Sequence, residues 1–200
     1  MSPSAGIRQE TGTALCLSIA INPTSSYTAS MAYRSEDLLA RLDELSINHE
    51  TIRHPPVFTV EEAQAHTSHL PGGHCKNLFL KDKKGGLWLL VCLDHRRIDM
   101  NRMSKVLSCP RLSFGKPELL LEVLGVTPGS VTPFALINDE QHQVQPLLDK
   151  AMMSHEILNY HPLTNEATTS IKSSDLLTFI NGIGHQPQIV DLVESGIDKA

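Results

Sequence analysis

Residues 76–93 read Lys-Asn-Leu-Phe-Leu-Lys-Asp-Lys-Lys-Gly-Gly-Leu-Trp-Leu-Leu-Val-Cys-Leu, and this stretch decides the fold. Its two apolar parts, residues 76–80 and 87–93, predict β-strands, and the polar, glycine-rich residues 82–86 between them predict a tight turn. The second apolar part is continuous, which is typical of a strand that is covered on both faces. The stretch therefore predicts a β-hairpin whose second strand lies inside the protein.

Helices are predicted before and after this hairpin in the sequence. Ser35 precedes leucines at helical spacing, and Thr59-Val60-Glu61-Glu62 is a capping box that opens a short helix. Further helices are predicted over residues 101–107, over Pro117 to Leu124 with Gly125 as the stop, and from Ser173 to Gly182 or Gly184. Two more strands are expected over residues 131–137 and 144–148. This mixture predicts an α/β fold with a mixed sheet, as a single compact domain over residues 31–200.

Composition narrows the class of protein. The chain has 200 residues, of which 40% are hydrophobic, so one domain can close a core without disulfides. No apolar run approaches eighteen residues, which excludes a membrane-spanning helix. The four cysteines lie far apart, as expected in a reducing, cytoplasmic compartment.

The first thirty residues differ from the rest. Residues 1–30 are polar and rich in Ser and Thr, so they predict a disordered N-terminal extension, and Met31 offers a second plausible start. The short apolar run at residues 14–21 has the length of a signal peptide. However, Glu10 precedes it and no convincing cleavage site follows, so an extension is the better interpretation.

Positive charge is concentrated in one part of an acidic chain. The net charge is −5, yet residues 76–116 contain ten Lys or Arg residues against three acidic ones, so the remaining residues carry −12. Such a stripe can bind a polyanion locally while the rest of the surface repels non-specific contacts. The alternative is an ordinary solvated face.

Three positions suit chemistry on an anionic or ester substrate. Lys76 follows a glycine-rich turn and offers a point charge for a phosphate or a carbonyl oxygen, or it simply covers an apolar surface. The loop Gly129-Ser130-Val131-Thr132-Pro133 can present backbone N–H groups to an oxyanion, or be an ordinary turn. His161 is held extended by the proline after it, as a donor or acceptor or as a structural histidine.

Metal and thiol chemistry find little support. No pair among His74, Cys75, Cys92, His95 and Cys109 has the spacing of a structural zinc site. His74 and Cys75 are neighbours on a predicted strand, so their side chains point to opposite faces and do not form a catalytic pair. The sequence therefore predicts neither a metal ion nor a covalent nucleophile.

Five segments, taken in order, carry a resemblance to a known family. They are His-Pro-Pro-Val-Phe-Thr-Val-Glu-Glu (54–62), Gly-Gly-His-Cys-Lys-Asn-Leu-Phe-Leu-Lys-Asp (72–82), Arg-Leu-Ser-Phe-Gly (111–115), Leu-Gly-Val-Thr-Pro-Gly-Ser-Val-Thr-Pro-Phe-Ala-Leu-Ile-Asn-Asp (124–139) and His-Pro-Leu-Thr-Asn-Glu-Ala-Thr-Thr (161–169). Together they resemble the YbaK-like prolyl-tRNA editing family. The similarity is greatest to the free-standing deacylases that remove alanine mischarged onto proline tRNA.

The resemblance implies a fold, an activity and site residues. It implies a mixed-sheet α/β domain that hydrolyses the ester between an amino acid and the terminal adenosine of tRNA, without a metal or other cofactor. Water is thought to be activated with help from a ribose hydroxyl. The residues that match the family's catalytic positions are Lys76, His161 and the loop Gly129, Ser130, Val131, Thr132 and Pro133. Asn77, Asn165 and Thr59 are expected to bind substrate.

The resemblance also gives the basic stripe a partner. Lys81, Lys83, Lys84, Arg96 and Arg97 are the candidates for contacts with tRNA phosphates. The partners expected are the acceptor end of proline tRNA and prolyl-tRNA synthetase, with no DNA and no membrane. Two alternatives stay open: a deacylase for another mischarged residue, such as cysteine or serine, and a non-catalytic protein of the same fold that binds tRNA or a synthetase.

Overall fold

The predicted hairpin is present at the centre of the sheet. A computed structural model describes residues 32–57 and 59–199, so the expected extension over residues 1–30 lies outside the described residues. Strand β2 (Gly73–Asp82) begins three residues earlier than predicted and pairs antiparallel with β3 (Leu87–Leu93). The buried Asp82 organises the turn, because its Oδ1 accepts the N–H groups of Lys84 and Gly86 at 2.7 and 2.9 Å.

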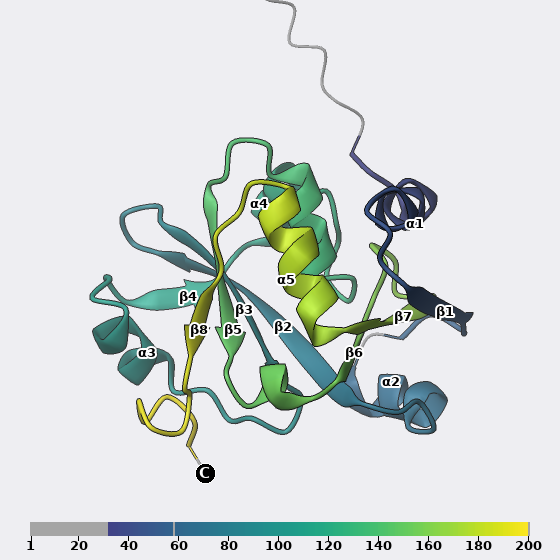
Figure 1. The fold of residues 1–200 in the computed structure, drawn as a ribbon. Coiled ribbons are helices and arrows are strands. Elements are labelled where there is room, and N and C mark those ends of the chain that lie inside the picture. The colour runs from purple at the N-terminus through teal and green to yellow at the C-terminus, as the bar shows by residue number, and fades with distance from the viewer. Residues whose placement is uncertain (1–31, 58, 200) are drawn as a thin grey trace, which may run out of the picture. The chain divides into compact units, whose positions relative to one another are not determined.

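Eight strands of the described chain form one mixed sheet (Figure 1). Its order is β1-β7-β6-β2-β3-β5-β8, with β4 paired to the far end of β2. β3, β5 and β8 run parallel, whereas β2–β3, β1–β7 and β6–β7 are antiparallel. The remaining strands are β1 (His49–Arg53), β4 (Leu112–Phe114), β5 (Val144–Asp149), β6 (Ile157–Tyr160), β7 (Ala167–Lys172) and β8 (Gln188–Val190). The mixed-sheet α/β prediction is confirmed.

The helices begin and end close to the predicted residues. Thr59 caps its helix as expected, since its hydroxyl accepts the Glu62 N–H at 3.2 Å and Glu62 accepts the Thr59 N–H in return. Gly125 ends its helix in the left-handed conformation, with φ 64°. The five α-helices in the described residues are α1 (Ser35–Glu44), α2 (Val60–Thr67), α3 (Met100–Val106), α4 (Pro117–Leu124) and α5 (Ser173–Gly182).

One predicted strand is wrong. Residues 131–137, expected to be extended, instead lead into the 3₁₀ helix η1 (Pro133–Asn138). Pro133 occupies its first turn and the Thr132 hydroxyl accepts the Phe134 N–H, which is an N-terminal signal for a helix. The residues Phe134 to Ile137 are all buried, and a short buried helix and a buried strand look alike in an apolar run.

Successive side chains of the hairpin strands point to opposite faces of the sheet, so the hydrophobic core has two parts. Phe79, Leu89 and Val91 face one side, where α4, α5 and η1 cover them. Leu80, Leu90 and Cys92 face the other side and pack with α3 and the C-terminal residues of the described chain. β3 is therefore buried on both faces, as its continuous apolar sequence predicted.

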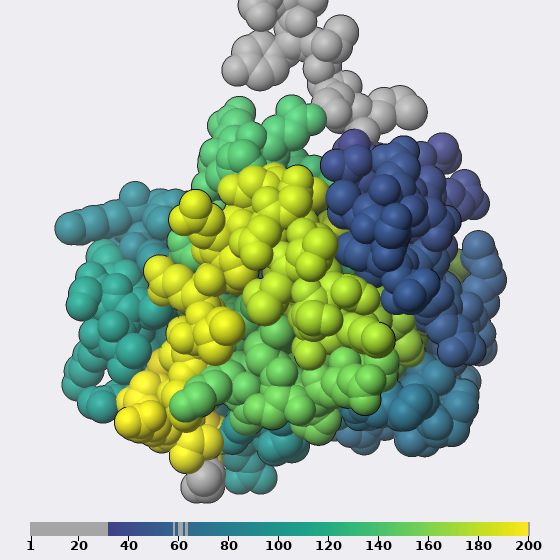
Figure 2. Space-filling model, viewed as in Figure 1, coloured from purple at the N-terminus to yellow at the C-terminus, as the bar shows by residue number. Residues whose placement is uncertain are grey.

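Helices α1 and α5 lie next to each other. Figure 2 shows α1 and α5 side by side on one face of the molecule, and Leu45, just after α1, lies close to Gly182 at the end of α5. In the described part of the chain, no helix is long and apolar enough to cross a membrane.

Candidate functional site

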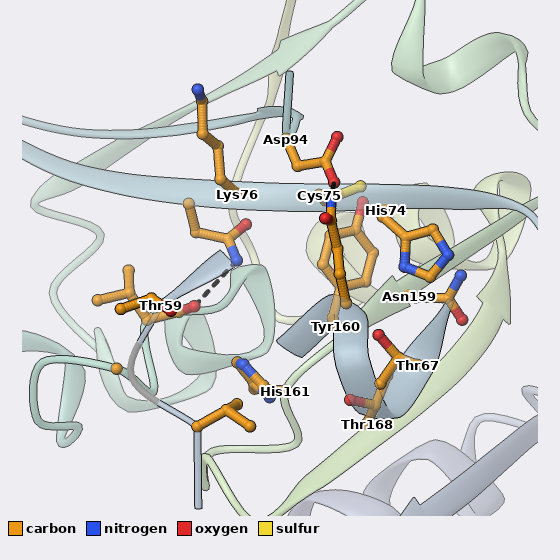
Figure 3. A pocket seen from close by; sticks show the side chains of 15 residues that line it. Thr59, Thr67, His74, Cys75, Lys76, Asp94, Asn159, Tyr160, His161 and Thr168 are labelled. Atoms are coloured by element: carbon orange, nitrogen blue, oxygen red, sulfur yellow. Dashed lines mark hydrogen bonds between the residues drawn. The ribbon is translucent and has the colours of Figure 1, made fainter. Parts of the chain in front are cut away.

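A cavity of about 240 Å³ opens beside the middle of β2. β2 pairs with β6 at its first two residues and with β4 at its last three, so its edge between these pairings borders the cavity. The wall also includes α2 and the loops around residues 57–59, 94, 129–131 and 161 (Figure 3). The lining residues are Val57, Thr59, Gln64, Thr67, His74, Cys75, Lys76, Asn77, Asp94, Gly129, Val131, Asn159, Tyr160, His161 and Thr168.

Six of the ten predicted catalytic and substrate-binding residues lie in this wall. These are Thr59, Lys76, Asn77, Gly129, Val131 and His161, brought together from distant parts of the sequence. Ser130, Thr132 and Pro133 are buried behind the loop and are not part of the wall. Asn165 is not part of the wall either, but its Nδ2 donates to the carbonyl of the lining residue Val57 at 3.0 Å.

Lys76 lies at the rim of the cavity. Its half-buried side chain is directed away from Tyr160 and His161 (Figure 3). The Nζ atom donates to the carbonyl oxygen of Arg96, and Lys76 has no carboxylate partner among the described residues. One of three ammonium protons is therefore engaged, and two are left for an incoming acceptor.

The loop at residues 127–131 is held in place from β2. Pro128 and Gly129 occupy the middle of a turn closed by a hydrogen bond from the Ser130 N–H to the Thr127 carbonyl at 3.0 Å. Gly129 has φ 91°, which favours glycine at this position of the turn. Asn77 Nδ2 donates to the Val131 carbonyl at 2.9 Å and so fixes the loop to the strand.

Three polar groups in this loop and on the adjacent part of β2 have no hydrogen-bond partner among the described residues. The N–H groups of Gly129 and Val131 have no acceptor among the described residues, and both residues line the cavity. The Oδ1 atom of Asn77 is buried without a hydrogen-bond partner there. Uncommitted backbone donors beside a cavity are suited to binding an anion or a developing oxyanion.

His161 is held as a neutral acceptor. Its Nδ1 lies 2.9 Å from the Ala167 carbonyl, and because a carbonyl can only accept, Nδ1 carries the proton and Nε2 has a free lone pair. Burial lowers the pKa of His161, the bond to Ala167 opposes this shift, and His54 nearby lowers the pKa further. The His54 ring lies 6.1 Å away and is itself held by the Thr168 hydroxyl at 3.0 Å.

Cys75 is no candidate for a nucleophile. Burial raises the pKa of its thiol to about 12, so the thiolate is not populated at neutral pH. The Sγ atom lies 3.7 Å from the Gly73 carbonyl, and the side chain packs against the core next to Tyr160. His74 and Cys75 alternate along β2 as predicted and form no catalytic pair.

The wall contains residues that the sequence did not reveal. Asn159 is buried and donates to the Pro71 carbonyl at 3.0 Å, while Ser170 donates to its Oδ1 at 2.6 Å, so it fixes the start of β2. Gln64 Nε2 donates to Asp94 at 2.9 Å and holds α2 over the cavity. Asn159 and Tyr160 directly precede His161 in the sequence, and this position could have indicated that they line the cavity. Both residue types also occur often in protein cores, so the position alone did not identify them.

Arg96 was expected to contact a tRNA phosphate, and the structure contradicts this expectation. Its side chain is 11% exposed and its guanidinium is paired with Asp149 at 3.1 Å and Asp198 at 2.7 Å, so it is not free to bind a phosphate. Lys81, Lys83, Lys84 and Arg97 are exposed and have no ion pair in the described chain, so their tRNA contacts stay predictions. No group of three or more potential metal-ligating His, Cys, Asp or Glu side chains is assembled among the described residues.

Comparison with known proteins agrees with the motifs and the fold. A sequence model of the aminoacyl-tRNA editing domain matches residues 54–179. Prolyl-tRNA synthetase associated domain-containing protein 1 of Bos taurus is 44% identical over 156 residues, which cover 76% of this chain and 91% of the relative. The prolyl-tRNA editing protein ProX of Acetoanaerobium sticklandii is 33% identical over 156 residues, covering 78% and 95%.

Solved structures share the fold. A crystal structure of a candidate trans-editing enzyme for prolyl-tRNA synthetase superposes with a TM-score of 0.62 at 20% identity, covering 80% of this chain and 96% of that one. A hypothetical protein superposes with a TM-score of 0.63 at 18% identity, covering 77% and 97%. With the sequence matches, these similarities place the chain: it belongs to the aminoacyl-tRNA editing domain family, the YbaK-like family whose motifs its sequence carries.

Proposed function

We propose that this protein is a trans-editing deacylase that hydrolyses the ester of mischarged alanyl-tRNA for proline, with residues 31–200 as the editing domain. The observation that carries the proposal is the cavity itself. It combines the Lys76 ammonium, the uncommitted N–H groups of Gly129 and Val131, and the Nε2 acceptor of His161. The family and the name of the ProX relative support tRNA editing as the activity.

The arrangement suits attack by water on an aminoacyl ester. The ester carbonyl faces the Gly129 and Val131 N–H groups, which stabilise the oxyanion that develops there. Water adds to the carbonyl carbon, the bond to the ribose oxygen breaks, and the proton released by water passes to that oxygen. The products are the free amino acid and tRNA with a free terminal hydroxyl. Because the ester is already labile, positioning and oxyanion stabilisation suffice, without a covalent intermediate.

Lys76 and His161 have separate roles in this proposal. Lys76 lies across β2 from the loop that Asn77 holds, so its ammonium suits the phosphate of the terminal adenosine better than the ester carbonyl. His161 Nε2 accepts a hydrogen bond from the attacking water, from the ribose hydroxyl or from the amino group of the substrate. Val57 and Thr59 line the same cavity.

The preference for alanine follows from a double sieve. Alanine is smaller than proline, so a synthetase site built for proline cannot reject it strongly, and a second, smaller cavity removes the error. Purified protein is to be assayed against alanyl-, cysteinyl-, seryl- and prolyl-tRNA for proline. We expect alanine to be released fastest and proline to be spared. Faster release of cysteine or serine would mean that the preferred substrate carries that amino acid instead of alanine.

A second candidate is a non-catalytic synthetase partner in the cytoplasm. The names of the animal relatives, which describe a prolyl-tRNA synthetase associated domain, favour it. The same assay decides between the two, because a binding protein releases none of the four amino acids. Prolyl-tRNA synthetase is also the partner we propose for the deacylase.

The exposed cations predict a specific salt dependence. Neutralising Lys81, Lys83, Lys84 and Arg97 to Gln is expected to raise KM for the tRNA and to leave kcat unchanged. The slope of log(kcat/KM) against log salt should fall by about 0.7 for each phosphate that the variant no longer neutralises. Neutralising Lys150 and Lys172, which are exposed elsewhere, is the matched control. An unchanged slope would show that the stripe is an ordinary solvated face.

The state of His161 predicts an acidic limb in the pH profile. Its folded pKa lies below 6.5, so Nε2 is free at pH 7 and becomes protonated only when the pH falls through that lower value. We expect kcat/KM to fall in that range and to fall there much less in His161→Gln. Stability follows the same direction, because the unfolded chain binds this proton more readily: the contribution is full above pH 6.5 and is lost as the pH falls towards the folded pKa. An identical limb in both proteins would assign it to another group.

A further inference from the structure

The C-terminal residues of the described chain hold the loop that follows β3. The Asp99 N–H donates to the Ile197 carbonyl at 2.8 Å, and the Lys199 N–H donates to the Arg97 carbonyl at 2.7 Å. Ile98 and Asp198 form an isolated antiparallel bridge between these two bonds. Ile197 is buried in the core beneath them. Residues 197–199 therefore act as a short extra strand along residues 97–99.

Asp198 also fixes Arg96. One carboxylate oxygen accepts Arg96 Nη1 at 2.7 Å, and the other accepts the Arg97 N–H at 2.8 Å. The other side of the guanidinium is held by Asp149, whose side chain is 0% exposed. Burial opposes ionisation of Asp198, but the bonds from Arg96 and Arg97 outweigh it and lower its pKa. Asp198 therefore holds the loop both through the side chain of Arg96 and through the backbone N–H of Arg97.

The clamped loop contacts the side chain of Lys76. The carbonyl oxygen of Arg96 accepts a hydrogen bond from the Lys76 ammonium. Among the described residues, this oxygen is the acceptor that holds the ammonium in place. A lysine side chain is flexible, with a point charge at the end of four methylene groups, so its position depends on its partner. The carbonyl can hold Lys76 only if Arg96 itself is fixed, and Asp198 and Asp149 fix it.

We propose that Asp198 is a positioning residue for Lys76: through Arg96, it fixes the peptide carbonyl that keeps the lysine ammonium at the rim of the cavity. The proposal rests on the proposed function, in which Lys76 binds the substrate's terminal phosphate. A charged group must be held close to its productive position, because a displacement of about 1 Å can cost about 100-fold in rate. No part of Asp198 needs to touch the substrate.

The test is Asp198→Asn, which keeps the shape of the side chain and removes its charge. Lys76 reactivity is measured by brief acylation of the folded protein with acetic anhydride and mass spectrometry, with Lys83 as internal reference. We expect several-fold greater labelling of Lys76, and kcat/KM for alanyl-tRNA lower by about 10- to 100-fold. Asp198→Glu, which keeps the carboxylate, is expected to restore most of both.

Asp191→Asn is the matched control. Asp191 lies in the same C-terminal segment and pairs with Lys150 at 3.2 Å, but it bonds within its own turn and not to the 94–99 loop. Its substitution should leave Lys76 labelling and activity unchanged. Asp198→Ser is a second way to remove the carboxylate where Asp198→Asn does not fold, and it keeps the backbone bonds of residues 197–199.

Each outcome is decisive. Unchanged labelling and unchanged kcat/KM in folded Asp198→Asn would overturn the proposal, as would an equal effect of Asp191→Asn. If the wild-type protein releases no amino acid while Asp198→Asn still exposes Lys76 to acylation, the proposed function fails but the positioning of Lys76 by Asp198 stands.

Discussion

Lys76→Ala is expected to lower kcat/KM for alanyl-tRNA of proline by about 100- to 1000-fold, the usual loss for one preorganised charged contact. The reason is that Lys76 supplies the ammonium at the rim of the cavity, and no carboxylate in the described chain competes for it. The thermal unfolding of the variant should stay near that of the wild type, because a half-buried strand residue at a rim contributes little to the core. Single-turnover deacylation under saturating and sub-saturating protein separates binding from chemistry.

Cys75→Ala tests the competing mechanism at the neighbouring position. The thiol is neutral, with a pKa of about 12, so its loss should leave kcat/KM within a few-fold of the wild type. A thiol-nucleophile mechanism demands the opposite result. An inactive Cys75→Ala protein together with an active Lys76→Ala protein would reject both the site assignment and attack by water.

Gly129→Ala is expected to lower kcat by about 100-fold, with a smaller effect on KM. At φ 91° an alanine is strained by roughly 1–3 kcal/mol, and the loop relieves this strain by moving. The N–H groups of Gly129 and Val131 then no longer point at the developing oxyanion, and small displacements of such donors are costly. Single-turnover kinetics at saturating protein report the effect on the chemical step.

Gly85→Ala is the matched control for this strain. Gly85 has φ 93°, almost the same conformation, but it lies in the hairpin turn with no atom within 4 Å of an added Cβ. We expect it to lose a similar amount of stability while keeping kcat unchanged. Equal losses of kcat in the two variants would mean that strain alone, and not the position of the loop, explains the result for Gly129.

The parts of the fold that were predictable carry strong local signals. The hairpin has its apolar run and its Asp82-to-Gly86 turn, and the helix at Pro117 has a proline at its start and a glycine at its end. These signals act over a few residues, so they do not depend on the rest of the chain. Six of the residues that the motifs singled out line the same cavity.

Two features that the sequence did not predict depend on contacts between distant parts of the chain. The strand β7 (Ala167–Lys172) has the polar sequence Ala-Thr-Thr-Ser-Ile-Lys and is formed by pairing with β1 and β6, not by an apolar pattern. Arg96 looked like one of a row of free cations, because its two carboxylate partners lie 53 and 102 residues further along the chain. A sequence pattern shows charge but not the partner that neutralises it.

The same 102-residue separation has a consequence for how the protein is made. A ribosome delivers Arg96 well before Asp198, whereas a domain generally folds as one unit. The face of the hairpin that carries Leu80, Leu90 and Cys92 is completed by Leu192 and Ile197, so this half of the core closes only after the C-terminal residues have emerged. The 94–99 loop therefore receives its carboxylate clamp in the same step that completes the core, and a nascent chain without residues 197–199 lacks both.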